Sequence, residues 1–110
     1  VVICPCSGTT IGKLAAGIGD NLATRSAIVA LKERRKLIMV PREAPYATVH
    51  LENLAKLSGW GAVVIPASPG FYNHPKTMDD LIDFIVARIL DHLGRENELT
   101  KRWTGEEIDE

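Results

Sequence analysis

The sequence has few aromatic residues, almost no cysteine and no excess of charge of either sign. Aromatic residues make up 5% of the 110 residues, and 13 Lys and Arg face 14 Asp and Glu, which gives a formal net charge of -1. A general nucleic-acid-binding protein would have a basic surface, so this balance argues against that class. No apolar run approaches the roughly 20 residues that a membrane-spanning helix needs, which excludes such a helix from this sequence.

The cysteines and histidines offer little for disulfide or metal chemistry. Cys4 and Cys6 lie two positions apart in an apolar run. On a strand they would point to opposite faces, so a disulfide between them is not expected. Two thiols are too few for a structural zinc site, and His50, His74 and His92 share no metal-ligand spacing, so no metal is predicted. A reduced, cytoplasmic compartment is the better expectation.

Apolar runs alternate with helical patterns along the chain. The sequence predicts strands at residues 1–5, 36–40 and 62–65, and helices at residues 10–17, 22–34, 47–57 and 77–93. This order is typical of an α/β domain, with a parallel sheet between two layers of helices. We expect one domain over residues 1–94, followed by a polar tail over residues 95–110. Because the chain opens directly in an apolar strand, we also expect it to be the C-terminal part of something larger.

A polar stretch follows the first predicted strand, at the edge of the sheet where such folds bind ligands. In Ser7-Gly8-Thr9-Thr10, the hydroxyls and the backbone N–H groups of a helix N-terminus could hold a phosphate. The alternative is a capped turn that binds nothing. Arg42-Glu43, after the second strand, could bind a phosphate and transfer a proton. On spacing alone, a surface turn with a local ion pair is favoured for these two residues.

Three further cations interrupt apolar helical surfaces. Arg25 and Lys32 lie two turns apart on one face of the helix over residues 22–34, which should otherwise be largely buried. They either bind an anion or extend into water. Arg88 flanks the apolar stripe of the last helix and could reach the sheet edge near Tyr72. Its alternative is an ordinary position on the flank of a helix.

Taken together, these segments resemble the flavin prenyltransferases of the UbiX type. The matching stretches are VICPCSGTT, NLATRSAIVALKERRKLIMVPREAPY, HLENLAKLSGWGAVVIPASPGFYNHPKTMDDLIDFIVARILDHLG and LTKRW. The resemblance implies a Rossmann-like, flavodoxin-like fold that binds FMN and no metal, and that forms homododecamers with sites between subunits. The N-terminal half of the family's chain has no counterpart in these 110 residues.

The resemblance also implies a reaction. A dimethylallyl group passes from dimethylallyl phosphate to reduced FMN, and the product serves UbiD-type decarboxylases in ubiquinone biosynthesis or aromatic acid decarboxylation. By the resemblance, Ser7-Gly8-Thr9-Thr10 and Arg42 contact FMN, and Arg25 is counted with them. The alternatives are an FMN-dependent decarboxylase of the same fold group and an FMN-binding subunit without turnover.

The remaining residues are expected to act on the phosphate donor. The resemblance implies that Tyr72, Arg88 and Lys32 hold dimethylallyl phosphate, and that Lys32 and Glu43 are catalytic. Glu43 would handle a proton as phosphate leaves and the new ring closes. A cationic clamp of this kind stabilises the leaving phosphate most effectively in a dry pocket.

Overall fold

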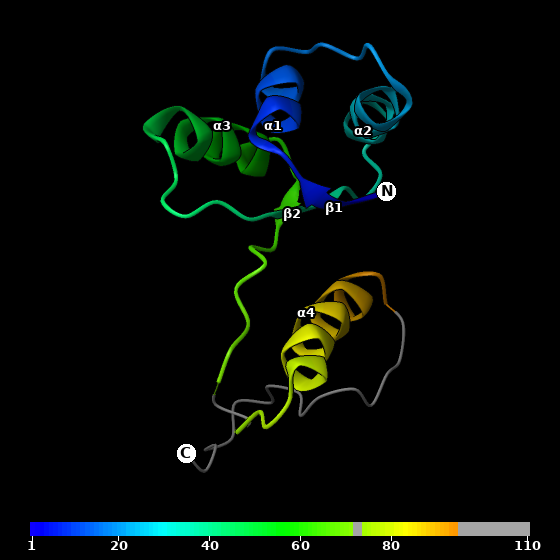
Figure 1. The fold of residues 1–110 in the computed structure, drawn as a ribbon. Coiled ribbons are helices and arrows are strands. Elements are labelled where there is room, and N and C mark those ends of the chain that lie inside the picture. Colours follow the sequence, from blue (N-terminus) through cyan, green and yellow to red (C-terminus); the bar gives the residue numbers. More distant parts are fainter. Residues whose placement is uncertain (72–73, 95–110) are drawn as a thin grey trace. The chain divides into compact units, whose positions relative to one another are not determined.

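The computed structural model describes residues 1–71 and 74–94 of the chain, in the order of strands and helices that the sequence predicts (Figure 1). The elements are β1 (Val2–Cys6), α1 (Gly8–Ala15), α2 (Leu22–Lys32), β2 (Ile38–Pro41), α3 (Thr48–Gly59), β3 (Val63–Val64) and α4 (Met78–His92). The chain divides into two compact units, Val1–Ala67 and Ser68–Glu110. The predicted boundary at residue 94 stays a prediction, because residues 95–110 lie outside the described part.

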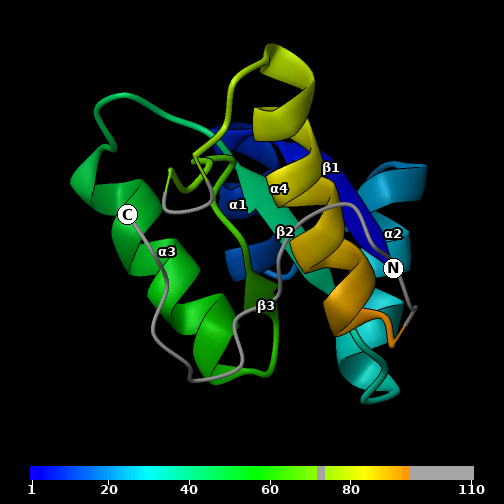
Figure 2. The ribbon, with the colours of Figure 1, turned by 90° about the horizontal axis from the view of Figure 1, so that it is seen from below.

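The three strands form a parallel sheet in the order β1-β2-β3. Ile3 pairs with Met39, and Met39 with Val64, so β2 lies between β1 and β3 (Figure 2). The register shifts between Ile3 and Cys6. Because all three strands run the same way, their carboxyl ends meet at one edge. The predicted α/β fold with a parallel sheet is confirmed.

Within Val1–Ala67, the helices α1, α2 and α3 lie on the same side of the sheet (Figures 1 and 2). The hydrophobic core between them and the sheet consists of Cys6, Ile11, Leu14, Ala27, Ala30, Leu37, Met39, Leu54, Leu57 and Ala62. Leu37 and Met39 point into this core, since alternate residues of a strand face the same side. Ile38 and Val40 are equally buried and belong to the opposite face of β2.

The prediction that α2 is largely buried is wrong for the described residues. Its buried positions are Thr24, Ala27 and Ala30, whereas Leu22 is 83% exposed and Val29 52% exposed. Two small alanines allow α2 to pack closely on one side only. Within the described part of the chain, apolar residues on the other sides of α2 have no neighbouring element to pack against. The number of apolar residues around the helix therefore overestimates how much of α2 is buried.

The unit that begins at Ser68 contains α4, whose N-cap is Thr77. The Thr77 hydroxyl accepts a hydrogen bond from the Asp80 N–H at 3.1 Å, and the Asp80 carboxylate accepts one from the Thr77 N–H at 3.2 Å. A third hydrogen bond reaches this carboxylate from the Lys76 N–H at 2.8 Å. The two backbone hydrogen bonds, that of Lys76 first, lower the pKa of Asp80. This pair of reciprocal contacts is a capping box.

Candidate functional site

The carboxyl ends of β1 and β2 open onto a cavity of about 290 Å³. Its lining residues are Pro5, Cys6, Ser7, Thr10, Arg42 and Glu43. They come from the end of β1, the N-terminus of α1 and the loop that follows β2. Two polar stretches that are far apart in the sequence therefore meet at the edge where the parallel sheet was expected to bind its ligand.

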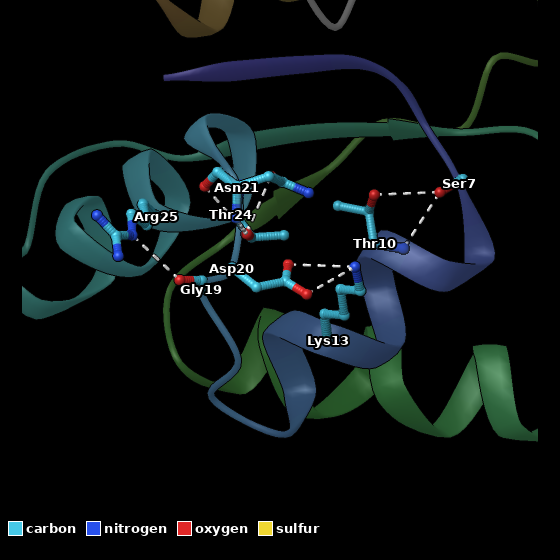
Figure 3. A network of polar contacts seen from close by, with 8 residues as sticks. All are labelled: Ser7, Thr10, Lys13, Gly19, Asp20, Asn21, Thr24 and Arg25. Carbon is cyan, nitrogen blue, oxygen red and sulfur yellow. Dashed lines mark hydrogen bonds and ion pairs between the residues drawn. The ribbon is translucent and has the colours of Figure 1, made fainter.

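The Ser7 side chain caps α1 and organises the first turn at this cavity. The Ser7 hydroxyl accepts a hydrogen bond from the Thr10 N–H at 3.1 Å and donates one to the Thr10 hydroxyl at 3.1 Å (Figure 3). The first N–H groups of a helix have no partner inside the helix. Since Ser7 satisfies Thr10, the N–H groups of Gly8 and Thr9 remain for an anion. The helix begins at Gly8, two residues earlier than predicted.

Glycine at position 8 has a packing reason that the sequence did not reveal. A Cβ at Gly8 would stand only 2.6 Å from Cε1 of His50, on α3, so a side chain here would force the imidazole to move. His50 is half-buried. The same geometry is compatible with a phosphate held by the backbone N–H groups of this turn. His50 has no metal-ligand spacing, and no sequence signal placed it near this turn.

Arg42 and Glu43 both line the cavity, with Arg42 exposed and Glu43 half-buried. Within residues 1–71 and 74–94, neither side chain forms an ion pair. The local ion pair that spacing alone favoured is therefore absent from the described residues. A guanidinium and a carboxylate that form no ion pair among the described residues are available to a ligand in the same cavity.

Cys6 contributes a neutral thiol to the cavity wall. Burial raises its pKa to about 11, so the thiol stays protonated at neutral pH and is a poor nucleophile. Its Sγ is 3.9 Å from the carbonyl oxygen of Ser7. The Cys6 side chain thus packs in the core and also borders the cavity, whereas Cys4 is exposed.

The structure does not bring Arg25 and Lys32 to this cavity. Arg25 lies on the exposed side of α2, where its Nε donates to the carbonyl oxygen of Gly19 at 3.2 Å (Figure 3). Lys32, at the end of α2, borders a different cavity. The predicted roles of both residues in binding FMN or phosphate stay predictions.

The other two predicted donor-binding residues are not tested by the geometry of this cavity. Arg88 lies on α4, in the second unit, and its guanidinium is 3.8 Å from the carboxylate of Asp91. Tyr72 lies outside the described residues. Over the described part of the chain, no three His, Cys, Asp or Glu side chains gather as a metal site would require. Nor does any helix there have the length and apolar character to cross a membrane.

Comparison with known proteins decides the family. Residues 1–90 match the family model described as Flavoprotein. The chain belongs to the Flavoprotein family. It is 55% identical over 103 residues to the flavin prenyltransferase UbiX of Pseudomonas aeruginosa, covering 94% of this chain and 49% of that protein. Against the UbiX of Thermoplasma acidophilum it is 59% identical over 103 residues, covering 94% and 57%. The chain thus spans about half the length of the curated relatives it matches.

Solved structures of Flavoprotein relatives have the same fold. A UbiX protein (AnUbiX, PadA1) in complex with FMN and dimethylallyl pyrophosphate has a TM-score of 0.90 and 40% identity, over 96% of this chain and 56% of that one. A dodecameric FMN-dependent UbiX-like decarboxylase from Escherichia coli O157:H7 has a TM-score of 0.89 and 48% identity, over 94% and 56%. These matches confirm the resemblance to UbiX-type proteins and the Rossmann-like fold.

Proposed function

We propose that this chain forms part of a flavin prenyltransferase, which transfers a dimethylallyl group from dimethylallyl phosphate to reduced FMN. The observation that carries the proposal is the cavity that joins the Ser7 turn to Arg42 and Glu43. It occurs in a chain 55% and 59% identical to two flavin prenyltransferases. A helix N-terminus, an arginine and a carboxylate are the groups needed to bind a phosphate and move a proton.

The residues of the cavity fit FMN as an anionic, hydrogen-bonding ligand. The free N–H groups of Gly8 and Thr9 and the hydroxyls capped onto α1 offer donors to its phosphate or to polar atoms of its ring. The Arg42 guanidinium adds a charged donor that no described residue occupies. When bound, reduced FMN supplies N5 and C6, the atoms to which the dimethylallyl group is joined. No metal is needed in this scheme.

The chain's own residues would divide the work on the donor. Cations stabilise the departing phosphate as the bond between the allyl carbon and the phosphate oxygen breaks. By the resemblance these cations are Lys32 and Arg88, with Tyr72 as a hydrogen-bond donor. Glu43 would hold the proton that moves as phosphate leaves and the ring closes. Its half-buried position at the cavity wall suits a group that must exchange a proton with a ligand.

We further propose that the site is completed by a neighbouring subunit. The cavity with Glu43 lies at the N-terminus of α1, and Lys32 borders a cavity at the C-terminal end of α1. An eight-residue helix separates its ends by about 12 Å. A homo-oligomer, such as the dodecamer of the Escherichia coli relative, would let Lys32 reach the cavity of another copy.

Two alternatives keep the same fold. The first is an FMN-dependent decarboxylase. Two proteins of similar structure support it: a phenylacrylic acid decarboxylase from Aquifex aeolicus and the UbiX-like decarboxylase from Escherichia coli. The second is an FMN-binding subunit without turnover. All three share the phosphate-binding turn, so FMN binding alone does not separate them.

The test is a mass measurement on the flavin. FMN reduced with dithionite is incubated anaerobically with the longest natural protein that contains this chain, with and without dimethylallyl phosphate and, separately, with an aromatic acid. The mass of the released flavin is then measured. A flavin heavier by one five-carbon unit is the expected result. Unmodified FMN with release of carbon dioxide from an aromatic acid would replace the proposal with the decarboxylase. Unmodified FMN with neither reaction would favour the non-catalytic subunit.

The cellular setting follows from the same proposal. We place the protein in the cytoplasm, because Cys4 and Cys6 are both free thiols and free thiols persist in a reducing compartment. The prenylated flavin would pass to a UbiD-type decarboxylase, in ubiquinone biosynthesis or in aromatic acid decarboxylation.

A further inference from the structure

Gly8 begins α1 beside the cavity, and the His50 imidazole of α3 lies against it. A Cβ at Gly8 would stand 2.6 Å from Cε1 and 3.1 Å from Cδ2 of His50. An atom at 2.6 Å would overlap the ring, so the imidazole occupies the space that a side chain at position 8 would take. Gly8 is not among the glycines with a positive φ. Its backbone conformation therefore does not require a glycine, whereas the close approach of His50 does.

His50 lies on the face of α3 that packs against α1. Leu54 and Leu57 follow it at the spacing of one helix face, and both are buried in the core. On α1, Ile11 lies one turn after Gly8 and is buried in the same core. The packing between the two helices is therefore apolar in its interior, and at the cavity it ends in the contact between Gly8 and His50.

The same histidine is tied to the other wall of the cavity. The loop that carries Arg42 and Glu43 leads directly into α3, and His50 lies in the first turn of that helix. Tyr46, near the end of the loop, packs against the core. The His50 N–H donates to the carbonyl oxygen of Ala47 at 3.0 Å, which fixes the backbone that carries the ring. The imidazole thus links the loop on one side of the cavity to the turn on the other.

Hydrogen bonding within the protein does not explain this histidine. Among the described residues, no hydrogen bond or ion pair joins the His50 imidazole to another group. The residue is half-buried and does not line the cavity, so it is not placed to touch a ligand there. Its effect on the site must pass through the backbone at Gly8, against which the ring packs.

We propose that His50 is a positioning residue for the phosphate of FMN. Its ring sets the spacing between α3 and the first turn of α1, and so holds the N–H groups of Gly8 and Thr9 where phosphate oxygens can accept from them. Donors that are held in place before binding give higher affinity, because less ordering accompanies binding. This inference rests on the proposed FMN site and names a residue that keeps it in shape.

The first test compares FMN with riboflavin, which lacks the phosphate. Affinities are measured by flavin fluorescence with the longest natural protein that contains this chain. His50→Ala should weaken FMN binding by about tenfold and leave riboflavin binding unchanged, because the turn would hold only the phosphate. Asn53→Ala is the control: it removes another half-buried polar side chain of α3, one that does not meet Gly8, and both affinities should stay the same.

The outcomes separate this inference from the proposed function. A wild-type protein that does not bind FMN would overturn the proposed FMN site itself. If the wild type binds FMN, an unchanged FMN affinity in His50→Ala, or equal weakening of both flavins, would overturn the positioning role alone. Equal loss of FMN affinity in His50→Ala and Asn53→Ala would also overturn it.

A double-mutant cycle tests the contact itself. Alanine is preferred to glycine within helices, so Gly8→Ala should be harmful only if its methyl group meets the His50 ring. We expect Gly8→Ala to weaken FMN binding by about tenfold or more in the wild type, and by much less when combined with His50→Ala. The circular dichroism of each flavin-free variant should remain that of the wild type. Equal effects of Gly8→Ala in the two backgrounds would overturn the proposal.

Discussion

Lys32 and Glu43 offer a direct test of whether the site is shared between subunits. In one protomer they border different cavities, at opposite ends of α1. The flexible four-carbon stem of a lysine does not span the roughly 12 Å length of that helix. If both residues act on one donor molecule, each must therefore come from a different copy. Lys32→Ala and Glu43→Gln are the two perturbations, first alone and then mixed.

Each variant alone should lose most of its prenylation activity. Removal of a general acid or base lowers turnover by about 10²- to 10⁴-fold, which we expect for Glu43→Gln. FMN affinity should change little, because Glu43 forms no ion pair with a described residue and the substitution therefore breaks no such pair in the binding site. Consider an oligomer assembled at random from equal amounts of both variants. About one quarter of the shared sites then receive an intact Lys32 from one subunit and an intact Glu43 from the other.

The assay is co-expression of the two variants with different affinity tags, followed by purification through both tags. Prenylated flavin is measured by mass after anaerobic turnover and is normalised to bound FMN. Activity near a quarter of the wild-type value is the expected outcome. Mixed oligomers no more active than the separate variants would refute the reasoning, since both residues would then come from one subunit. An active Lys32→Ala protein would remove Lys32 from the mechanism.

The remaining predictions concern stability and thiol chemistry. Asn21→Ala should lower the free energy of unfolding in urea by about 1 kcal/mol, because Asn21 Oδ1 accepts hydrogen bonds from the N–H and the hydroxyl of buried Thr24 at 2.8 and 3.0 Å (Figure 3). Asn21→Asp keeps the acceptor and should change this free energy little. Equal losses in the two variants would contradict the capping role of Asn21. Iodoacetamide at pH 8 should modify exposed Cys4 before buried Cys6, whose pKa of about 11 keeps its thiol protonated; equal rates would contradict this order. Because backbone hydrogen bonds from Lys76 and Thr77 lower the pKa of Asp80, its carboxylate stabilises the folded state above the unfolded pKa of about 3.9, and this stability is lost as pH falls through the folded pKa. The free energies of unfolding of wild type and Asp80→Asn should therefore differ near neutral pH and converge in strong acid; a difference that persists in strong acid would contradict this role.

Local signals were sufficient to predict most of the fold. Apolar runs that end at Pro5 and Pro41 marked two of the strands, and Thr77 marked the start of α4. These are short-range effects of backbone chemistry and periodicity. Burial of α2 was not predictable in this way, because it depends on which neighbours a helix has. Leu22 and Val29 are apolar and nevertheless exposed.

Topology is sufficient to predict the cavity. It is also sufficient to predict that Lys32 lies away from it. Ser7 and Arg42 meet because β1 and β2 are neighbouring parallel strands and each residue directly follows its strand. The same rule places the end of a helix that leads into a parallel strand at the opposite edge of the sheet. Lys32 ends α2, and β2 begins six residues later at Ile38, so Lys32 belongs to the amino edge of its own sheet. The resemblance grouped Lys32 with Arg42 and Glu43 as one site, but strand direction separates them within a protomer. If these residues act on one donor molecule, a second copy must bring them together.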